Sequence, residues 1–186
     1  MIEYNYYEYL KTRSIKGFLY RKLYLYPRLI FFIRGRLLDV GCGIGDMLKT
    51  YKNSVGVDIN PETVSHCTKI GCTALVMEEN ILPFVDSTFD TILLDNVIEH
   101  IEDPIPLMKE VARVLKSSGS IIIGVPGKKG FDFDPDHKKF YDDLEIDELA
   151  KKLNFKIITK FYTPVGIKYL SKLIRQYCQY YVIKLG

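Results

Sequence analysis

Residues 37–49 constrain the fold of this chain more than any other stretch. They read LLDVGCGIGDMLK, which is an apolar run containing Asp39, three glycines at alternate positions and an amphipathic stretch. A short apolar run that ends at glycines is typical of a buried parallel strand, and the stretch behind it predicts a helix. Gly41, Gly43 and Gly45 permit a turn whose backbone approaches a ligand closely. The pattern therefore predicts a strand, a turn and a helix that face one ligand.

The charges at this turn indicate what the ligand carries. Asp39, at the carboxyl end of the predicted strand, would attract a cationic group and repel a pyrophosphate, whereas amides at the start of the helix suit a carboxylate. The spacing also differs from the G-x-G-x-x-G of dinucleotide-binding proteins, because Asp46 directly follows Gly45. A ligand with both an ammonium and a carboxylate is therefore favoured over a dinucleotide.

Residues 38–45, LDVGCGIG, resemble the first motif of class I S-adenosylmethionine-dependent methyltransferases, especially the branch called methyltransferase domain 11. Further motifs extend the resemblance over roughly residues 35–162. It implies a single doubly wound α/β domain over 1–186, with a mostly parallel seven-stranded sheet in the order 3-2-1-4-5-7-6 and an antiparallel last strand. It also implies S-adenosylmethionine as the cofactor. Residues 1–34 are predicted as a helical lid or edge segment, and 163–186 as a basic helix with a closing strand.

The cofactor contacts that we expect follow the predicted strand ends. Asp58 ends a second predicted strand, where an acid can accept hydrogen bonds from both ribose hydroxyls. In the segment 77–84, the resemblance aligns Glu78 with an acid that holds the adenine amino group, although Asp is usual there, and Glu79 offers its backbone amide. The full set of predicted cofactor-binding residues is Asp39, Gly41, Cys42, Gly43, Gly45, Asp58, Ile59, Glu78, Glu79, Asp95 and Asn96.

The predicted catalytic residues are His137, His100 and Asp95. Asp95 and His100 follow the fourth predicted strand, at the end where doubly wound sheets bind ligands. A hydroxyl acceptor needs a base, and histidine has its ordinary pKa near neutral pH. His137 lies in the long loop 126–137, so it is the predicted general base, with Asp134 or Asp136 to orient its ring. A surface histidine that steadies an acidic loop is the alternative for His137, and a packed histidine for His100.

No metal site is predicted from the sequence. Acids at positions 132, 134 and 136 resemble a calcium loop, but His137 stands where the sharp-turn glycine belongs. The four cysteines have no zinc spacing and are predicted to be reduced thiols.

The two ends of the chain are basic and its centre is acidic. Residues 1–36 hold eight Lys or Arg and two Glu, 151–186 hold eight and no acid, and 37–150 hold ten against twenty-one acids. A predicted basic helix from Val165 to about Gln176 suits an anionic membrane surface or an acidic partner, or simply packs on the sheet. No apolar run approaches the ~20 residues that span a bilayer, and no signal-like segment is seen, so the cytoplasm is predicted.

The reaction that we expect is methyl transfer to the hydroxyl of a small molecule or glycan. The loop motifs GVPGKKG and DPDH resemble those of methyltransferases in surface-polysaccharide pathways. Two alternatives stay open. The basic ends could bind RNA, although an N-P-P-Y-type motif, common in enzymes that methylate base amines, is absent. The chain could also bind S-adenosylmethionine without catalysis, because binding does not require turnover.

Overall fold

The computed structural model describes residues 15–166 and 174–186. The predictions for residues 1–14 and 167–173 lie outside this part of the chain. They concern the beginning of the helical lid or edge segment expected over 1–34 and most of the basic helix expected from Val165 to about Gln176. The strands form one seven-stranded sheet in the order β3-β2-β1-β4-β5-β7-β6. This is the order that the resemblance implied.

The strands divide into a parallel part and an antiparallel edge. β1, β2, β3, β4 and β5 run parallel to one another, and β7 runs antiparallel to both β5 and β6, as expected for the last strand. In chain order the strands are β1 (Leu37–Val40), β2 (Ser54–Asp58), β3 (Ala74–Val76), β4 (Phe89–Asp95), β5 (Leu115–Pro126), β6 (Phe155–Thr163) and β7 (Cys178–Leu185).

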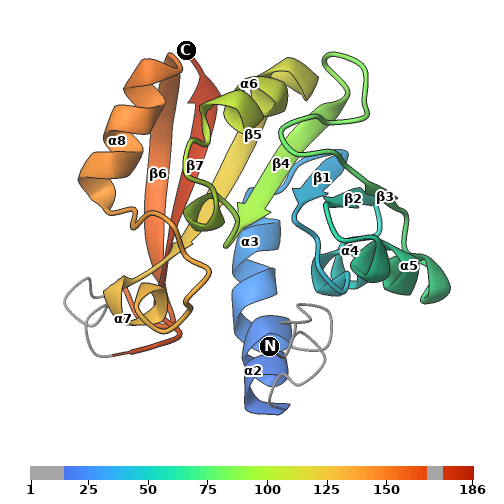
Figure 1. Ribbon diagram of the computed structural model, residues 1–186, viewed down its shortest axis with the longest axis horizontal. Helices are drawn as coiled ribbons and strands as arrows, with labels where there is room; N and C mark the ends of the chain where they lie inside the picture. Colours follow the sequence, from blue (N-terminus) through green and yellow to red (C-terminus); the bar gives the residue numbers. More distant parts are fainter. Residues whose placement is uncertain (1–14, 167–173) are drawn as a thin grey trace.

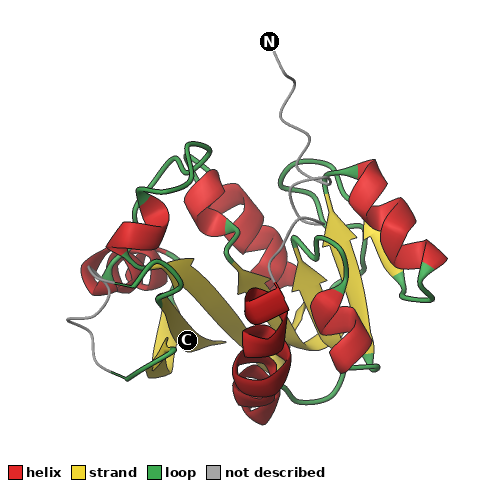
Figure 2. Ribbon diagram, turned by 90° about the horizontal axis from the view of Figure 1, so that it is seen from below, coloured by secondary structure: helices red, strands yellow, loops and turns green. Residues whose placement is uncertain are grey.

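Helices cover both faces of this sheet (Figures 1 and 2). Two of these helices begin at a side chain that caps the helix N-terminus. The Asn60 side chain accepts a hydrogen bond from the Glu62 N–H ahead of α5, and Asp142 caps α8 in the same way. The helical elements are α2 (Ile15–Tyr20), the π-helical turn η1 (Arg21–Leu25), α3 (Tyr26–Phe32), α4 (Asp46–Thr50), α5 (Pro61–Lys69), the 3-10 turn η2 (Ile98–His100), α6 (Ile105–Val114), α7 (Lys128–Phe131) and α8 (Asp143–Lys152).

The side-chain alternation of the strands assigns the helices to the two faces. In β4, Ile92 and Leu94 belong to a core that also holds apolar residues of α6 and α8. Leu93, between them, points to the opposite face and packs in a second core with α3 and Met47 of α4. Successive residues of a strand point to opposite sides, so each face buries its own set of helices.

Two local predictions differ from the structure. From Asp103-Pro104 onward the sequence predicts a helix to about Lys116 and a turn at Ser118–Gly119, but the helix ends at Val114, and β5 begins directly at Leu115. Leu115 is buried, and the Lys116 ammonium lies 2.8 Å from an Asp90 carboxylate oxygen on β4, so contacts with β4 hold this segment in the sheet. The predicted loop 126–137 also contains a helical turn, α7.

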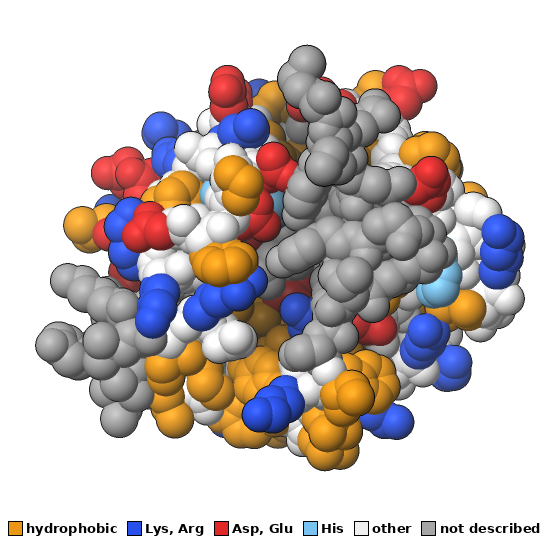
Figure 3. Space-filling view, turned by 60° about the horizontal axis from the view of Figure 1, so that its bottom comes forward, with side chains coloured by type: hydrophobic (Ala, Val, Ile, Leu, Met, Phe, Trp, Pro, Cys, Tyr) orange, Lys and Arg blue, Asp and Glu red, His pale blue; other side chains and the backbone are white. Residues whose placement is uncertain are grey.

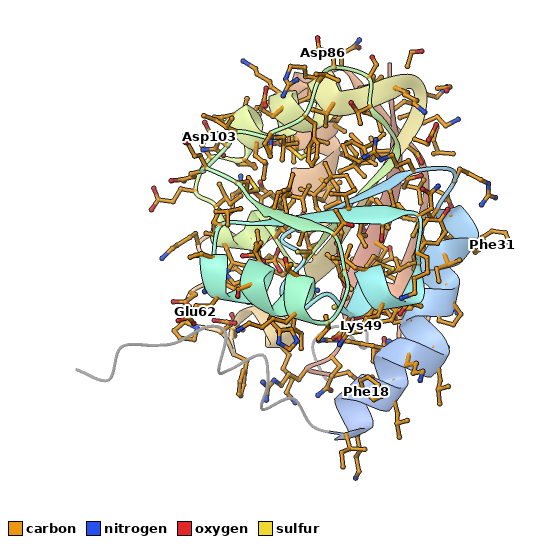
Figure 4. The ribbon with its side chains drawn as sticks, turned by 90° about the vertical axis from the view of Figure 1, so that its right-hand side faces the viewer. Phe18, Phe31, Lys49, Glu62, Asp86 and Asp103 are labelled. Carbon is orange, nitrogen blue, oxygen red and sulfur yellow. The ribbon has the colours of Figure 1, made fainter. Side chains whose placement is uncertain are left out.

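The described part of the N-terminal segment packs against the sheet along one side. Leu25, Leu29 and Ile33 are buried, whereas Phe18 and Phe31 are exposed on its outer side (Figure 4). Hydrophobic side chains and Lys or Arg lie next to one another along the lower edge of the face in Figure 3. Within the described residues, no helix has the length and apolarity needed to cross a membrane.

Candidate functional site

A cavity of about 480 Å³ lies at the carboxyl ends of β1, β4 and β5. Figure 1 shows α7 and α2 on the same lower side of the sheet as the carboxyl end of β4. The cavity wall has five parts, which are the turn 41–44 with Asp39 and the start of α4, the end of β4 with His100, the segment from Pro126 to His137, the segment 175–180, and the N-terminal helical segment. Of the predicted residues it contains Asp39, Gly41, Cys42, Gly43, Asp95, Asn96, His100 and His137.

The glycine turn is shaped by its conformation and by its neighbours. Gly41, Gly43 and Gly45 all have positive φ angles, of 71°, 51° and 77°. A Cβ on Gly41 would lie 2.7 Å from a methyl of Val97, and one on Gly45 would lie 2.9 Å from the sulfur of Cys67. Glycine is therefore required at these two positions by backbone strain and close packing, besides any approach of a ligand.

Asp39 gives the cavity a buried carboxyl group. Its side chain is only 4% exposed and lies on the cavity wall. Burial, followed by the charges of Asp95 and Asp58, raises the pKa of Asp39 well above its ordinary value. A cation placed beside it would favour the ionised form, so this position fits the ammonium group of an amino-acid ligand.

Asp58 holds the glycine turn rather than facing the cavity. One of its carboxylate oxygens accepts the backbone N–H of Gly43 at 2.9 Å, and the other accepts that of Asn60 at 2.9 Å. Asp58 is absent from the cavity wall, as are Gly45, Ile59, Glu78 and Glu79. Ile59 and the two glutamates are exposed beyond the ends of β2 and β3, and their contacts with ribose and adenine remain predictions.

Asp95 and Asn96 form the floor of the cavity at the end of β4. The hydroxyl of Tyr180, on β7, donates to Asp95 Oδ1 at 2.7 Å, and Asn96 Nδ2 donates to the same oxygen at 3.0 Å. Asn96 itself adopts a left-handed φ of 59°. The sequence analysis missed Tyr180, because nothing local links it to a residue 85 positions earlier.

The predicted base, His137, lies on the cavity wall but is oriented by other groups than expected. Its Nδ1–H donates to the backbone carbonyl of Phe131 at 2.8 Å, and its Nε2 lies 4.0 Å from Glu99 Oε1. The expectation that Asp134 or Asp136 orients the ring is wrong, since the Asp134 carboxylate instead accepts the backbone N–H of Asp136 at 3.0 Å. A carbonyl can only accept, so Nδ1 carries the proton and the lone pair of Nε2 faces Glu99.

Glu99 is a functional candidate that the sequence analysis missed. Its side chain is 0% exposed, and burial raises its pKa to about 8, partly opposed by its own backbone N–H. The ring centroids of His100 and His137 are 4.6 Å apart beside it. Burial, and then the charge of His137, lowers the pKa of His100. The signal available was an acid inside the otherwise apolar run Val97–Ile101, next to a histidine.

Arginine side chains also reach the cavity, which the acidic composition of the central segment did not predict. Arg21 lies in the π-helical turn η1, a kind of irregularity that is frequent at functional sites. Arg175 enters from the other side, with its guanidinium carbon 3.1 Å from the centroid of the Phe133 ring. The cavity can therefore contact carboxylates as well as cations.

The comparisons with known proteins agree with this geometry. Residues 38–123 match a family model described as a methyltransferase domain. An S-adenosylmethionine-dependent methyltransferase, named as probable, from Mycobacterium tuberculosis is 30% identical over 129 residues, which are 63% of this chain and 46% of the relative. Residues 38–123 form a methyltransferase domain of the class I S-adenosylmethionine-dependent type. S-adenosylmethionine is accordingly its cofactor, and the carboxyl group of Asp39 fits the ammonium of that molecule.

Two further relatives differ in how much of each chain is aligned. An uncharacterised protein of Methanocaldococcus jannaschii is 35% identical over 136 residues, 67% of this chain and 66% of its own. The human protein named Probable tRNA methyltransferase 9B is 36% identical over 110 residues, 54% of this chain. The aligned part of the chain spans only 24% of that human protein.

Solved structures share the fold at low sequence identity. An S-adenosylmethionine-dependent methyltransferase of Archaeoglobus fulgidus has a TM-score of 0.71 at 21% identity, with 96% of this chain and 100% of that chain covered. The methyltransferase chain in a complex with the Trm112 activator of Haloferax volcanii has a TM-score of 0.77 at 14% identity, with both chains covered completely. These likenesses support the fold and leave the acceptor open.

Proposed function

We propose that this methyltransferase transfers the methyl group of S-adenosylmethionine to a hydroxyl oxygen of a small molecule or glycan. One observation carries the proposal. A histidine whose tautomer is fixed, His137, shares a cavity of about 480 Å³ with Asp39 and the glycine turn. An oxygen nucleophile needs a group that accepts its proton, and here such a group lies on the wall of the cofactor cavity.

The residues of the chain then act by positioning and by proton transfer. S-adenosylmethionine supplies a methyl group already activated by its sulfonium charge, so the protein needs mainly to orient the acceptor and exclude water. Asp39 holds the ammonium end, and the Asp95 carboxylate, fixed by Tyr180, borders the transfer position. As the oxygen–carbon bond forms and the carbon–sulfur bond breaks toward sulfur, His137 Nε2 takes the hydroxyl proton.

The acceptor class is supported by size and by the loop above the cavity. The volume must contain the methionine part of the cofactor together with the reacting part of the acceptor, which favours a single sugar-sized group. The segment 124–137 resembles loops of surface-polysaccharide methyltransferases. A sugar hydroxyl in such a pathway is therefore the acceptor that we propose.

Transfer to tRNA is the second candidate, because a specific relative favours it. The similarity to the human protein named Probable tRNA methyltransferase 9B covers 110 residues of this chain. The basic segments 1–36 and 151–186 would supply phosphate contacts, and their number sets how steeply RNA affinity falls with salt. In this case the acceptor binds mostly outside the cavity.

A turnover screen separates these functions. The full chain is incubated with S-adenosylmethionine carrying a labelled methyl group and with nucleotide sugars, glycan oligomers or tRNA in parallel. Label in a sugar or glycan as a base-stable methyl ether supports the proposal. Label only in tRNA, together with salt-sensitive tRNA binding, overturns it in favour of the second candidate. Cofactor binding without transfer to any acceptor would favour the non-catalytic alternative.

A further inference from the structure

Three side chains that can each bind a metal ion lie close together beside the cavity, with His100 and His137 on its wall and Glu99 buried behind them. Glu99, His100 and His137 each offer one ligand atom, and these atoms all lie within 4.8 Å of one another. The Glu99 Oε1 to His137 Nε2 distance is 4.0 Å. An ion bound at about 2.0–2.2 Å holds neighbouring ligand atoms about 3–3.5 Å apart, so side-chain shifts of about 1 Å would bring the cluster into range.

The imidazole rings already make the hydrogen bonds that metal-bound histidines make. His137 donates its Nδ1–H to the carbonyl of Phe131, and the ring of His100 hydrogen-bonds to the backbone of Asp136. A histidine that ligates a metal usually donates its other N–H to such a group, which fixes the tautomer and aims the remaining lone pair. In His137 that lone pair belongs to Nε2, the atom that faces Glu99.

The carboxylate of Glu99 lacks the partners that its burial demands. It is 0% exposed, and no other described residue donates a hydrogen bond to either of its oxygens. Its backbone carbonyl accepts the N–H groups of Lys138 and Lys139 at 2.7 and 3.1 Å, so the residue is held against the segment that carries His137. Burying an unpartnered carboxyl group is costly, and a cation would supply the missing partner.

We propose that Glu99, His100 and His137 bind one first-row divalent transition-metal ion of the zinc type. Two imidazoles and one carboxylate suit zinc, cobalt, manganese or iron, whereas calcium and magnesium prefer oxygen ligands alone. Three protein ligands leave a position open, and both histidines line the cavity. Asp95 and Asp134 on the same wall add negative charge that favours a cation.

This site deepens the proposed function, and its catalytic role rests on that function. A cation here would lower the pKa of a hydroxyl that reaches it. His137 would then serve as a ligand, and the hydroxyl proton would pass to water in the cavity instead of to Nε2. Binding of the ion does not depend on which acceptor the enzyme uses, so the two proposals can fail separately.

Titration of the full chain with Co²⁺ tests the site directly. After treatment with a chelator, the wild-type protein should bind one Co²⁺, followed by visible absorption and by calorimetry, and Zn²⁺ should displace it. Glu99→Gln and His137→Gln should each weaken binding by roughly 100-fold or more. The matched controls are Glu148→Gln, an exposed residue on α8, and His66→Gln on α5, and both should bind as the wild type does.

Several results would overturn the site. These are no Co²⁺ binding by the wild type at millimolar ion, equal affinity in Glu99→Gln, or a thiolate-to-cobalt charge-transfer band, which would place the ion at cysteines. Thermal melting shows whether each variant folds, and if Glu99→Gln does not, His137→Gln and His100→Gln decide the result. A protein that binds Co²⁺ but methylates only tRNA keeps the metal site and contradicts the proposed acceptor.

Discussion

The two sides of the cavity differ in how their polar groups are satisfied. On the cofactor side, the carboxylate of Asp58 is hydrogen-bonded by two backbone N–H groups, and the glycine turn is fixed by close packing. On the opposite side, Glu99 is fully buried with no partner from another described residue, and the lone pair of His137 Nε2 faces it. Asp58 and the glycine turn are therefore complete in the protein alone, and on that side Asp39 keeps a proton until a cation binds, whereas Glu99 has no partner from the protein and needs a ligand or a proton. The comparison suggests that the cofactor side is preorganised and that chemistry depends on the other side.

The largest expected effect comes from a substitution on the side of the cavity near Glu99, where the buried carboxylate has no hydrogen-bond partner from another described residue. His137→Ala should lower kcat by ~10²–10⁴, because it removes the group that promotes loss of the hydroxyl proton. The Kd for S-adenosylhomocysteine should change by less than about twofold, measured by calorimetry. Near-normal turnover with the identified acceptor would contradict the role of His137 and direct attention to His100 or Asp95.

Asp39 provides the matching test on the cofactor side. Asp39→Asn should weaken binding of S-adenosylhomocysteine by about 1.5–3 kcal/mol, which is the usual range for a hydrogen bond to a charged group. It should raise KM for S-adenosylmethionine far more than it lowers kcat. A variant that loses kcat while its cofactor affinity stays intact would break the division between the two sides.

Asp58 should affect the cofactor through the shape of the glycine turn. Asp58→Ala leaves the N–H groups of Gly43 and Asn60 without their acceptor, so cofactor binding should weaken by roughly 1–3 kcal/mol and the melting temperature should fall as well. Differential scanning calorimetry with and without S-adenosylhomocysteine separates the two effects. Unchanged stability with weaker binding would instead favour direct contact with ribose.

The smallest expected effect is a pH dependence of folding stability and of cofactor affinity, and it arises from the carboxyl group of Asp39. Its pKa in the folded protein lies above its ordinary value of 3.8, so the native state keeps a proton that the unfolded chain has lost. Stability of the cofactor-free protein should therefore fall as pH rises from about 4 through the raised pKa. Cofactor affinity should rise over the same window, by at most tenfold per pH unit, because an ammonium favours the ionised form. Asp39→Asn should remove this part of both slopes, as seen in melting and calorimetric titrations at several pH values.

The sequence predicted most of the fold because its signals are local or follow a shared pattern. The glycine turn, the Asn60 cap and the sheet order could be predicted from residues 38–60 and the resemblance they carry. The start of β5 at Leu115 could not, because only the burial of that residue against β4 makes it a strand.

The site was predictable to the extent that its residues follow strands. Asp39, Asp95 and His100 lie at strand ends and were found, as was His137 in the loop after β5. Tyr180 and Glu99 were not, because the importance of each depends on a segment distant in the chain. Tyr180 meets Asp95 through the pairing of β7 with β5, and the backbone carbonyl of Glu99 accepts the N–H groups of residues 138 and 139.

β7 is the last strand in the sequence but lies inside the sheet, and this position determines when the enzyme can become active during synthesis. This strand forms from residues 178–185 but lies between β5 and β6, which are both made earlier, and it brings the Tyr180 hydroxyl to Asp95. During synthesis a chain that has not reached residue 180 has a gap in its sheet and an unsupported floor under the cavity. Methyl transfer must therefore wait until nearly all of these residues have left the ribosome, so that incomplete chains contribute no activity.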